Sequence, residues 1–177
     1  MNLYDLNSDN TIMNIDGKDI EMKPAMCYDK VYERWLVSKC GKIWSLHFNR
    51  LVTGGKTFLH RHGAEKRLQH INLSISIDNL YEDGSGHIRH DAKTKTRQIK
   101  YHKVVIDTWA PLYDNPPEGI VWEEWEIVRR DLPSVYNHIN KTVCIDHIDD
   151  DPTNNHLNNL RRVTQWDNNH TRKSKGI

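Results

Sequence analysis

The sequence predicts an α+β protein in which a β-rich N-terminal region precedes a C-terminal strand–loop–strand–helix (ββα) unit. Two runs of β-forming residues flank a short turn at Lys39–Gly41, and apolar residues alternate from Ile71 to Ile77. A third signal begins at Val143, where β-forming residues are followed by a polar loop, a short apolar run and a helix-start pattern. Together these observations place strands early in the chain and a small mixed unit at its end.

The N-terminal region holds the first two of these signals. Residues 1–30 are polar with few periodic apolar positions, so we expect irregular structure or a short strand pair there. Residues 35–46 favour two strands around the turn. The strict alternation within residues 69–80 is typical of a strand with one buried face.

The middle of the chain is less regular. Residues 99–109 are compatible with a strand or a helix, and we favour a short helix that starts after Tyr101 and ends before Pro111. Residues 115–119 (NPPEG) form a loop, and the acidic segment after them fits an amphipathic helix or a strand. We therefore divide the chain into a β-rich region over residues 1–110 and a C-terminal region over residues 111–177.

Composition excludes several classes of protein. No stretch approaches the roughly 20 apolar residues that span a bilayer, and the N-terminus lacks the pattern of a signal peptide. The three cysteines are scattered, and no pair has the C-x2-C spacing of a zinc site. We expect a soluble intracellular protein with reduced thiols, no membrane partner and no structural zinc.

Charge is segregated along the chain although the net charge is only +1. Basic residues form runs at 50–67, 93–103 and 161–175, whereas acidic residues gather at 114–131 and 146–151. Each run alone is as compatible with a solvated face as with a binding surface. Taken together, their separation suits an electrostatic footprint on DNA.

The residues that carry chemistry lie between 142 and 173. Val143–Ile145 lead as a strand into Asp146 and His147, and Leu160–Val163 can return as a second strand. Thr164 with Asp167 three residues later resembles a capping box, so a helix is expected to start at about Gln165.

This ββα order brings the end of the first strand against the first turns of the helix. Asp146 and Asn168 then supply a carboxylate and an amide oxygen, which hard cations such as Mg²⁺ prefer, with positions left for water and phosphate. His147 alternates to the other side of the strand, and imidazole suits a general base that activates water.

The segment resembles the HNH (ββα-metal) nuclease motif, in particular that of phage HNH homing endonucleases. The family pattern reads roughly (D/H)-H-x-D, N-N, N-L-x-x-V-T-x-x-x-N. It is matched in order by Asp146-His147-Ile148-Asp149, Asn154-Asn155, Asn159-Leu160, Val163-Thr164 and Asn168. Residues 101–109 resemble the helix that commonly precedes the motif, and residues 37–45 resemble a nuclease-associated module.

The resemblance implies a metal-dependent endonuclease. By similarity Asp146 and Asn168 are metal ligands for Mg²⁺ or Mn²⁺, His147 is the general base, and Asn159 braces the loop that orients His147. Asn154 and Asn155 are expected to be turn-forming residues, and His102 a structural histidine. Residues 1–110 become the DNA-recognition region and residues 111–177 the HNH domain.

The implied reaction is hydrolysis of a DNA phosphodiester to a 5′ phosphate and a 3′ hydroxyl. A monomer with one such site nicks double-stranded DNA, and a homodimer or two successive events cut both strands. A phage-encoded protein of this kind acts in the cytoplasm of its bacterial host. The alternatives are a restriction-type or packaging-associated HNH nuclease, and a non-catalytic DNA- or RNA-binding protein that keeps the fold.

Two further sets of residues have expected roles. The DNA-contact set consists of Arg50, Lys56, Arg61, Lys66, Arg67, Arg161, Arg162 and Arg172. A ββα unit this small buries little core alone. We expect it to dock onto the preceding segment through Ile145, Leu157, Leu160, Val163 and Trp166.

Overall fold

The computed structural model describes residues 10–46, 48–52 and 96–174, together with short strand segments at 57–61, 64–68, 73–76, 81–82 and 88–89. The chain forms two compact units, one made of residues 1–52 and 102–177 and the other of residues 53–101. The boundary expected between residues 110 and 111 falls inside the first unit. As a division between DNA recognition and cleavage it stays a prediction.

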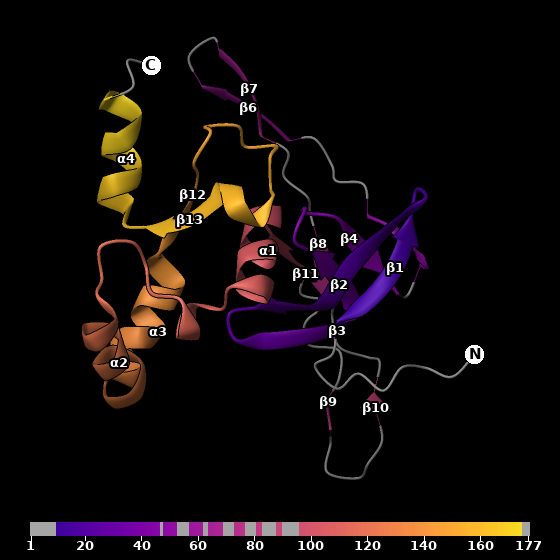
Figure 1. The fold of residues 1–177 in the computed structure, drawn as a ribbon, viewed down its shortest axis with the longest axis horizontal. Helices are drawn as coiled ribbons and strands as arrows, with labels where there is room; N and C mark the ends of the chain where they lie inside the picture. The colour runs from indigo at the N-terminus through magenta and orange to yellow at the C-terminus, as the bar shows by residue number, and fades with distance from the viewer. Residues whose placement is uncertain are drawn as a thin grey trace. The chain divides into compact units, whose positions relative to one another are not determined.

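The first unit begins with a five-stranded antiparallel sheet in the order β1-β2-β3-β4-β5 (Figure 1). Its strands are β1 (Thr11–Ile15), β2 (Lys18–Cys27), β3 (Lys30–Ser38), β4 (Ile43–Ser45) and β5 (Arg50–Leu51). Of the two alternatives for residues 1–30, irregular structure or a short strand pair, the described residues form the strand pair, β1 with β2. The two strands expected around the Lys39–Gly41 turn are confirmed as β3 and β4.

The second unit consists of short antiparallel pairs. They are β6 (Thr57–Arg61) with β7 (Ala64–Leu68), β8 (Leu73–Ser76) with β11 (Thr96–Ile99), and β9 (Tyr81–Glu82) with β10 (Ile88–Arg89). The strand expected within residues 69–80 is confirmed at 73–76, and its remaining residues lie outside those described.

Helices follow in the first unit. They are α1 (Tyr101–Trp109), α2 (Trp122–Asp131) and α3 (Pro133–Thr142), with a 3₁₀ turn, η1 (Leu112–Asp114), between α1 and α2. The expected helix before Pro111 is confirmed as α1. The acidic segment takes the helical alternative, and Leu112, Trp125 and Tyr136 bury its apolar side in a small core between η1, α2 and α3. Nothing in the sequence pattern had singled out α3, although Pro133 at its first position suits a helix start.

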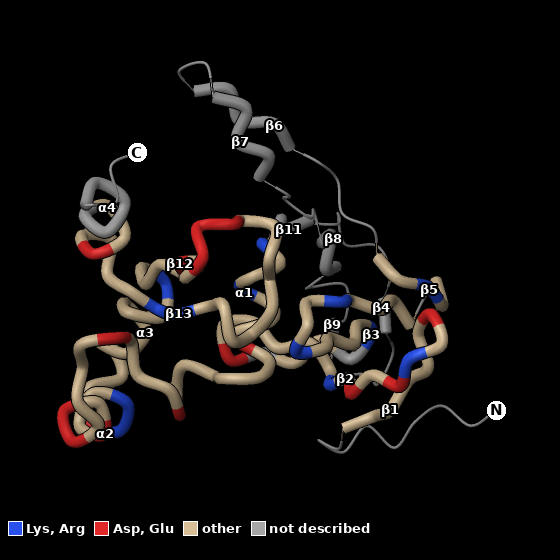
Figure 2. The backbone as a smooth tube through the Cα atoms, turned by 45° about the horizontal axis from the view of Figure 1, so that its top comes forward, with Lys and Arg blue, Asp and Glu red and all other residues tan. Residues whose placement is uncertain are grey.

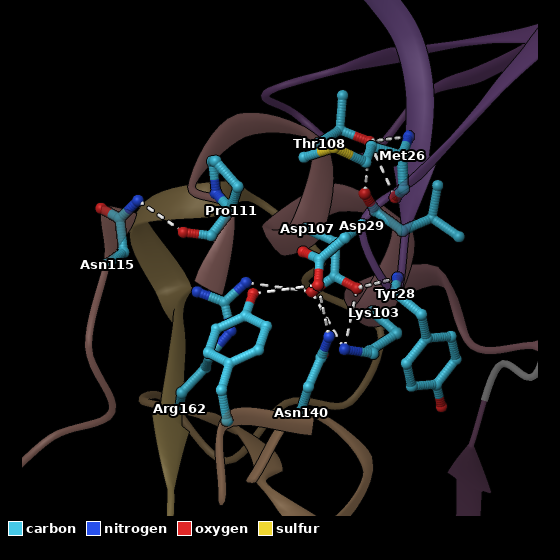
Figure 3. A network of polar contacts seen from close by, with 12 residues as sticks. Met26, Tyr28, Asp29, Lys103, Asp107, Thr108, Pro111, Asn115, Asn140 and Arg162 are labelled. Carbon is cyan, nitrogen blue, oxygen red and sulfur yellow. Dashed lines mark hydrogen bonds and ion pairs between the residues drawn. The ribbon is translucent and has the colours of Figure 1, made fainter. Parts of the chain in front are cut away.

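A buried polar network ties these helices to the sheet and to the chain's end (Figure 3). The Asp107 carboxylate on α1 contacts Lys103 Nζ at 2.8 Å and Arg162 Nη2 at 3.0 Å. It also accepts a hydrogen bond from the backbone N–H of Tyr28, at 3.1 Å, just after β2. All three charged side chains are at most 10% exposed. The network therefore fixes the sheet, α1 and the strand Leu160–Val163, which carries Arg162, to one another.

Asp29 forms a second link between the sheet and the helices. Its Oδ2 accepts hydrogen bonds from the Tyr136 hydroxyl at 2.9 Å and from Asn140 Nδ2 at 2.7 Å (Figure 3). Both donors lie on α3, so this carboxylate attaches α3 to the β2–β3 turn.

None of the helices that the structure describes combines the length and the apolar character needed to cross a membrane.

Candidate metal and nuclease centre

The C-terminal segment forms the strand–strand–helix order that the sequence predicts. Strand β12 (Cys144–His147) pairs antiparallel with β13 (Leu160–Val163), and a loop with a 3₁₀ turn, η2 (Leu157–Asn159), joins them. Helix α4 (Gln165–Ser174) follows directly and packs against β12. The chain therefore brings the end of β12 and the start of α4 together.

Thr164 and Asp167 fix the start of α4. The Asp167 backbone N–H donates to Thr164 Oγ1 at 3.1 Å, and Thr164 Oγ1 donates to Asp167 Oδ2 at 2.5 Å. A capping residue of this kind satisfies a backbone N–H that has no partner inside the helix. The predicted helix start at Gln165 is confirmed, and with it the position of Asn168 in the first turn.

Asp146 is 6% exposed and lies opposite Arg161 in the β12–β13 register. Arg161 donates to Asp146 Oδ2 from both Nε, at 3.1 Å, and Nη2, at 2.9 Å. Its Nη1 contacts Glu118 Oε2 at 3.1 Å, and the bond to Asp146 is the first cause that raises the pKa of the guanidinium. Arg161 thus bridges a buried carboxylate and an exposed one.

Asn168 presents a buried oxygen in the first turn of α4. Its Oδ1 is inaccessible to solvent, and no donor among the described residues reaches it. Buried amide oxygens are nearly always paired, so such an atom calls for a ligand or a water. Cys144 Sγ contacts Gln165 Oε1 at 3.0 Å, so this face of β12 looks toward α4. Asp146 shares the face with Cys144 because alternate side chains of a strand point the same way.

His147 points to the other face of β12. Its ring lies 5.2 Å from the ring of His102 on α1, in an edge-to-face arrangement at 71°. Its Nε2 lies 3.1 Å from Asn155 Oδ1, and both residues are less than 10% exposed. Asp146 and His147 therefore have different neighbours on the two faces of β12, as the predicted alternation requires. Asn155, expected only as a turn residue, is the side chain that contacts His147.

Asn159 holds the loop between the strands through Asp149 rather than through His147. Its Nδ2 donates to Asp149 Oδ1 and to the Asn154 carbonyl, both at 2.8 Å, and its Oδ1 accepts from the Asp149 N–H at 3.0 Å. Asp149 also accepts from Asn154 Nδ2 at 2.7 Å and from the Asp151 N–H at 2.8 Å. The Asn154 bond, followed by the others, lowers the Asp149 pKa below its usual value.

The donor set fits a hard divalent cation. No group of three or more His, Cys, Asp or Glu side chains arranged for a metal occurs in the described part of the chain. Asp146 and Asn168 nevertheless offer a carboxylate and an unpaired amide oxygen on facing elements, and Mg²⁺ commonly takes few protein oxygens and keeps waters. Because Arg161 bonds Asp146, this carboxylate could hold a cation only if that bond were released.

Acidic residues lie along the loop after β12 and along helix α2, among other places in the first unit (Figure 2). The loop carries Asp149–Asp151, and α2 carries Glu123, Glu124, Glu126 and Asp131. Through its hydrogen bonds with Asn154, Asn159 and the Asp151 N–H, Asp149 holds this loop in its conformation.

The expected DNA contacts divide into three groups. Arg50 on β5 is exposed and lies over the Phe48 ring, and Arg161 is part of the ion-pair bridge at Asp146. Arg162 is instead buried, with its side chain 3% exposed and paired to Asp107, so its guanidinium faces the protein. Lys56 lies outside the described residues, and the structure describes only the backbone of the other four: Arg61 on β6, Lys66 and Arg67 on β7, and Arg172 on α4.

The expected apolar contacts of the unit need one correction. Leu160 and Val163 are buried, and Ile145 and Leu157 are partly buried, as expected for docking residues. Trp166 is 65% exposed, so its ring does not contribute to that core as predicted. Helix α4 turns this position toward solvent while Asn168 faces inward.

Comparison with known proteins adds one finding. No protein-family model and no curated protein matches the chain. A solved structure reported as "DNA binding and cleavage by the HNH homing endonuclease I-HmuI" is similar at 19% identity and a TM-score of 0.45. The match covers 82% of this chain and 55% of that chain, so this chain spans about half the length of that protein. Both values are too low for the likeness to support a function, which has to rest on the residues of this chain.

Proposed function

We propose that the chain is a metal-dependent HNH endonuclease that hydrolyses a phosphodiester of double-stranded DNA. The observation that carries the proposal is the buried Oδ1 of Asn168, which has no partner among the described residues and lies on the helix that packs against β12. A buried acceptor that no donor satisfies lowers the stability of the fold by roughly 1–3 kcal/mol. Binding a metal ion would satisfy this oxygen and remove that cost. Asp146, on the β12 face directed at α4, supplies the second oxygen.

The roles of the side chains follow from the two faces of β12. A bound divalent cation supplies charge neutralisation for the phosphate and the departing 3′ oxygen. Asp146 and Asn168 hold that cation on one face. His147, on the other face, accepts the proton of the attacking water, and Asn159 orders the loop that follows it.

Arg161 is the residue that must move for this reaction. In the described arrangement it bonds Asp146 through two nitrogens and Glu118 through a third. Release of Asp146 leaves the guanidinium beside the site, tethered to an exposed carboxylate. A planar guanidinium binds phosphate through two hydrogen bonds, so we assign Arg161 to the DNA phosphate next to the scissile bond.

The test is nicking of supercoiled plasmid in Mg²⁺ or Mn²⁺, with EDTA as the metal-free control. We expect open-circular product only with metal, and a loss of rate of at least about 100-fold in His147→Ala and Asn168→Ala. Asn169→Ala is the matched control for the helix, because Asn169 is exposed and its side chain pairs only along the surface with Gln165 at 3.0 Å. His138→Ala, at an exposed position of α3, serves the same purpose for His147.

Two results would contradict the proposal. Wild-type protein that shifts DNA in a gel without cutting plasmid in either metal would indicate the non-catalytic binding protein instead. Nicking that persists in His147→Ala and Asn168→Ala would place the active residues elsewhere. The homing role, the target sequence and the choice between monomer and homodimer belong to the same proposal, and mapping of cleaved ends on the source genome tests them together.

A further inference from the structure

The turn between β3 and β4 lies against the loop that joins β12 and β13, far away in sequence. The Leu157 N–H donates to the Lys39 carbonyl at 2.8 Å. At Gly41, a Cβ would lie 3.1 Å from both Cβ and the carbonyl oxygen of Asn155. Gly41 also has a φ of +82°, which side chains rarely adopt. The backbone of this turn can approach Asn155 so closely only because residue 41 has no side chain.

Asn155 connects this contact to His147. The amide oxygen of Asn155 can only accept, so its 3.1 Å contact requires a proton on His147 Nε2. Asn155 Nδ2 donates to the Thr153 carbonyl at 3.3 Å, which sets which end of the amide faces the ring. In the neutral imidazole the lone pair is then on Nδ1, the nitrogen that can take a proton from water.

The turn is itself firmly held. Ser38 is fully buried, its Oγ accepts from the Lys42 N–H at 2.8 Å, and its backbone N–H donates to the Lys42 carbonyl at 2.9 Å. The Gly41 N–H donates to the Ser38 carbonyl at 3.2 Å. A turn closed by these bonds presents a fixed surface, and its position is passed to Asn155 by direct contact.

We propose that the turn Ser38–Lys42 is a positioning element for His147 and that it acts through Asn155. This inference rests on the proposed function, since it concerns the base of the nuclease reaction. Neither Gly41 nor Asn155 has to touch DNA. Asn155 sets the tautomer and the orientation of the ring, and the turn sets the place of Asn155. The N-terminal sheet then contributes to cleavage as well as to any recognition of DNA.

The deciding comparison is between Gly41→Ala and Gly17→Ala. Gly17, in the β1–β2 turn, has a similar φ of +76° but nothing within 4 Å of an added Cβ. Both substitutions place a side chain on a residue with positive φ, but only the added Cβ at position 41 would lie against Asn155. Asn155 must give way by a few tenths of an ångström. Because a displacement of about 1 Å can cost 100-fold, we expect the single-turnover nicking rate of Gly41→Ala to fall by roughly 3- to 10-fold. The plasmid concentration that gives half of the maximal rate should stay within about twofold of the wild-type value. Gly17→Ala should nick plasmid at the wild-type rate.

The ¹⁵N NMR shifts of the histidine rings give a readout that does not depend on cleavage. In its neutral form, wild-type His147 should show the Nε2–H tautomer, assigned by the absence of its signals in His147→Ala. Gly41→Ala and Asn155→Ala should show a mixture of tautomers. Asn155→Ala removes the acceptor without adding bulk, so it also covers the case in which Gly41→Ala does not fold.

The outcomes separate this proposal from the nuclease assignment. If the wild type does not nick, the assignment fails, and the tautomer measurement still decides whether the turn positions His147. If the wild type nicks and both variants keep its rate and its Nε2–H signal, the positioning role is overturned. A rate loss equal to that of Gly17→Ala also overturns it, since backbone strain alone would then explain the effect.

Discussion

Removal of the Asp107 carboxylate should destabilise the first unit far more than removal of the Arg162 guanidinium. Asp107→Ala leaves Lys103 and Arg162 as two buried cations without their anion and removes the acceptor of the Tyr28 N–H. Breaking a buried pair by deleting one partner costs about 3–5 kcal/mol. Arg162→Met leaves Asp107 paired with Lys103 and also removes Arg162 Nε, a buried donor with no partner among the described residues. We expect it to cost about 1 kcal/mol or less.

The assay is equilibrium unfolding in urea followed by tryptophan fluorescence. Every tryptophan of the chain belongs to the unit that contains this network, so the signal reports on that unit: Trp35, Trp44, Trp109, Trp122, Trp125 and Trp166. In thermal unfolding followed by the same signal, at about 2–4 °C per kcal/mol, Asp107→Ala should lower the melting temperature by about 6–20 °C. Asp114→Ala is the control, because Asp114 is 62% exposed where it pairs with Arg129, and it should change stability by less than about 1 kcal/mol.

Equal losses in Asp107→Ala and Arg162→Met would refute this reasoning. They would mean that the guanidinium contributes as much as the carboxylate, and that Lys103 does not compensate for its loss. A loss below about 1 kcal/mol in Asp107→Ala would show that water reaches the network, because screened pairs contribute little. The second result would also weaken the exclusion of Arg162 from the DNA-contact set.

Two further predictions concern the ββα unit. The lowered Asp149 pKa stabilises the loop fully above the ordinary carboxyl value of 3.8, and that contribution is lost as pH falls through the still lower folded value. The protection of amides 150–155 against exchange, relative to the intrinsic rate at each pH, should therefore fall below about pH 4, and Asp149→Asn should show the lower protection at neutral pH already. Thr164→Ala removes the cap of α4 and should cost about 1 kcal/mol in urea unfolding. A wild-type unfolding midpoint in Thr164→Ala would show that the cap bonds are not formed in solution.

The features that the sequence predicted well are set by neighbouring residues. The start of α4 depends on Thr164 and Asp167, three positions apart, and the end of α1 depends on the proline that follows. The pairing of β12 with β13 follows from two short β-forming runs around a polar loop. Each of these signals lies within one stretch of chain, so no knowledge of the fold was needed.

The features that were missed depend on distant residues. Asn155 was expected only to form a turn, and its contact with His147 requires the loop to be held by Lys39 and Gly41. Arg162 belongs to a basic run in the sequence, yet β13 turns it toward Asp107 while its neighbour Arg161 faces Asp146. Charge and spacing alone could not distinguish these two arginines. The alternation of side chains along β13, combined with the position of α1, does.

Strand β12 divides the proposed chemistry between two supports. On one face, Asp146 looks toward α4 and is held by Arg161; on the other, His147 lies between His102 and Asn155. Because the proposed ligand and the proposed base share one short strand, a shift of β12 should displace both, whereas a shift of the turn Ser38–Lys42 should act on the base alone. A change in that turn should therefore alter the rate of water activation while metal binding is kept. This separation is what lets positioning of the base be measured independently of the metal site.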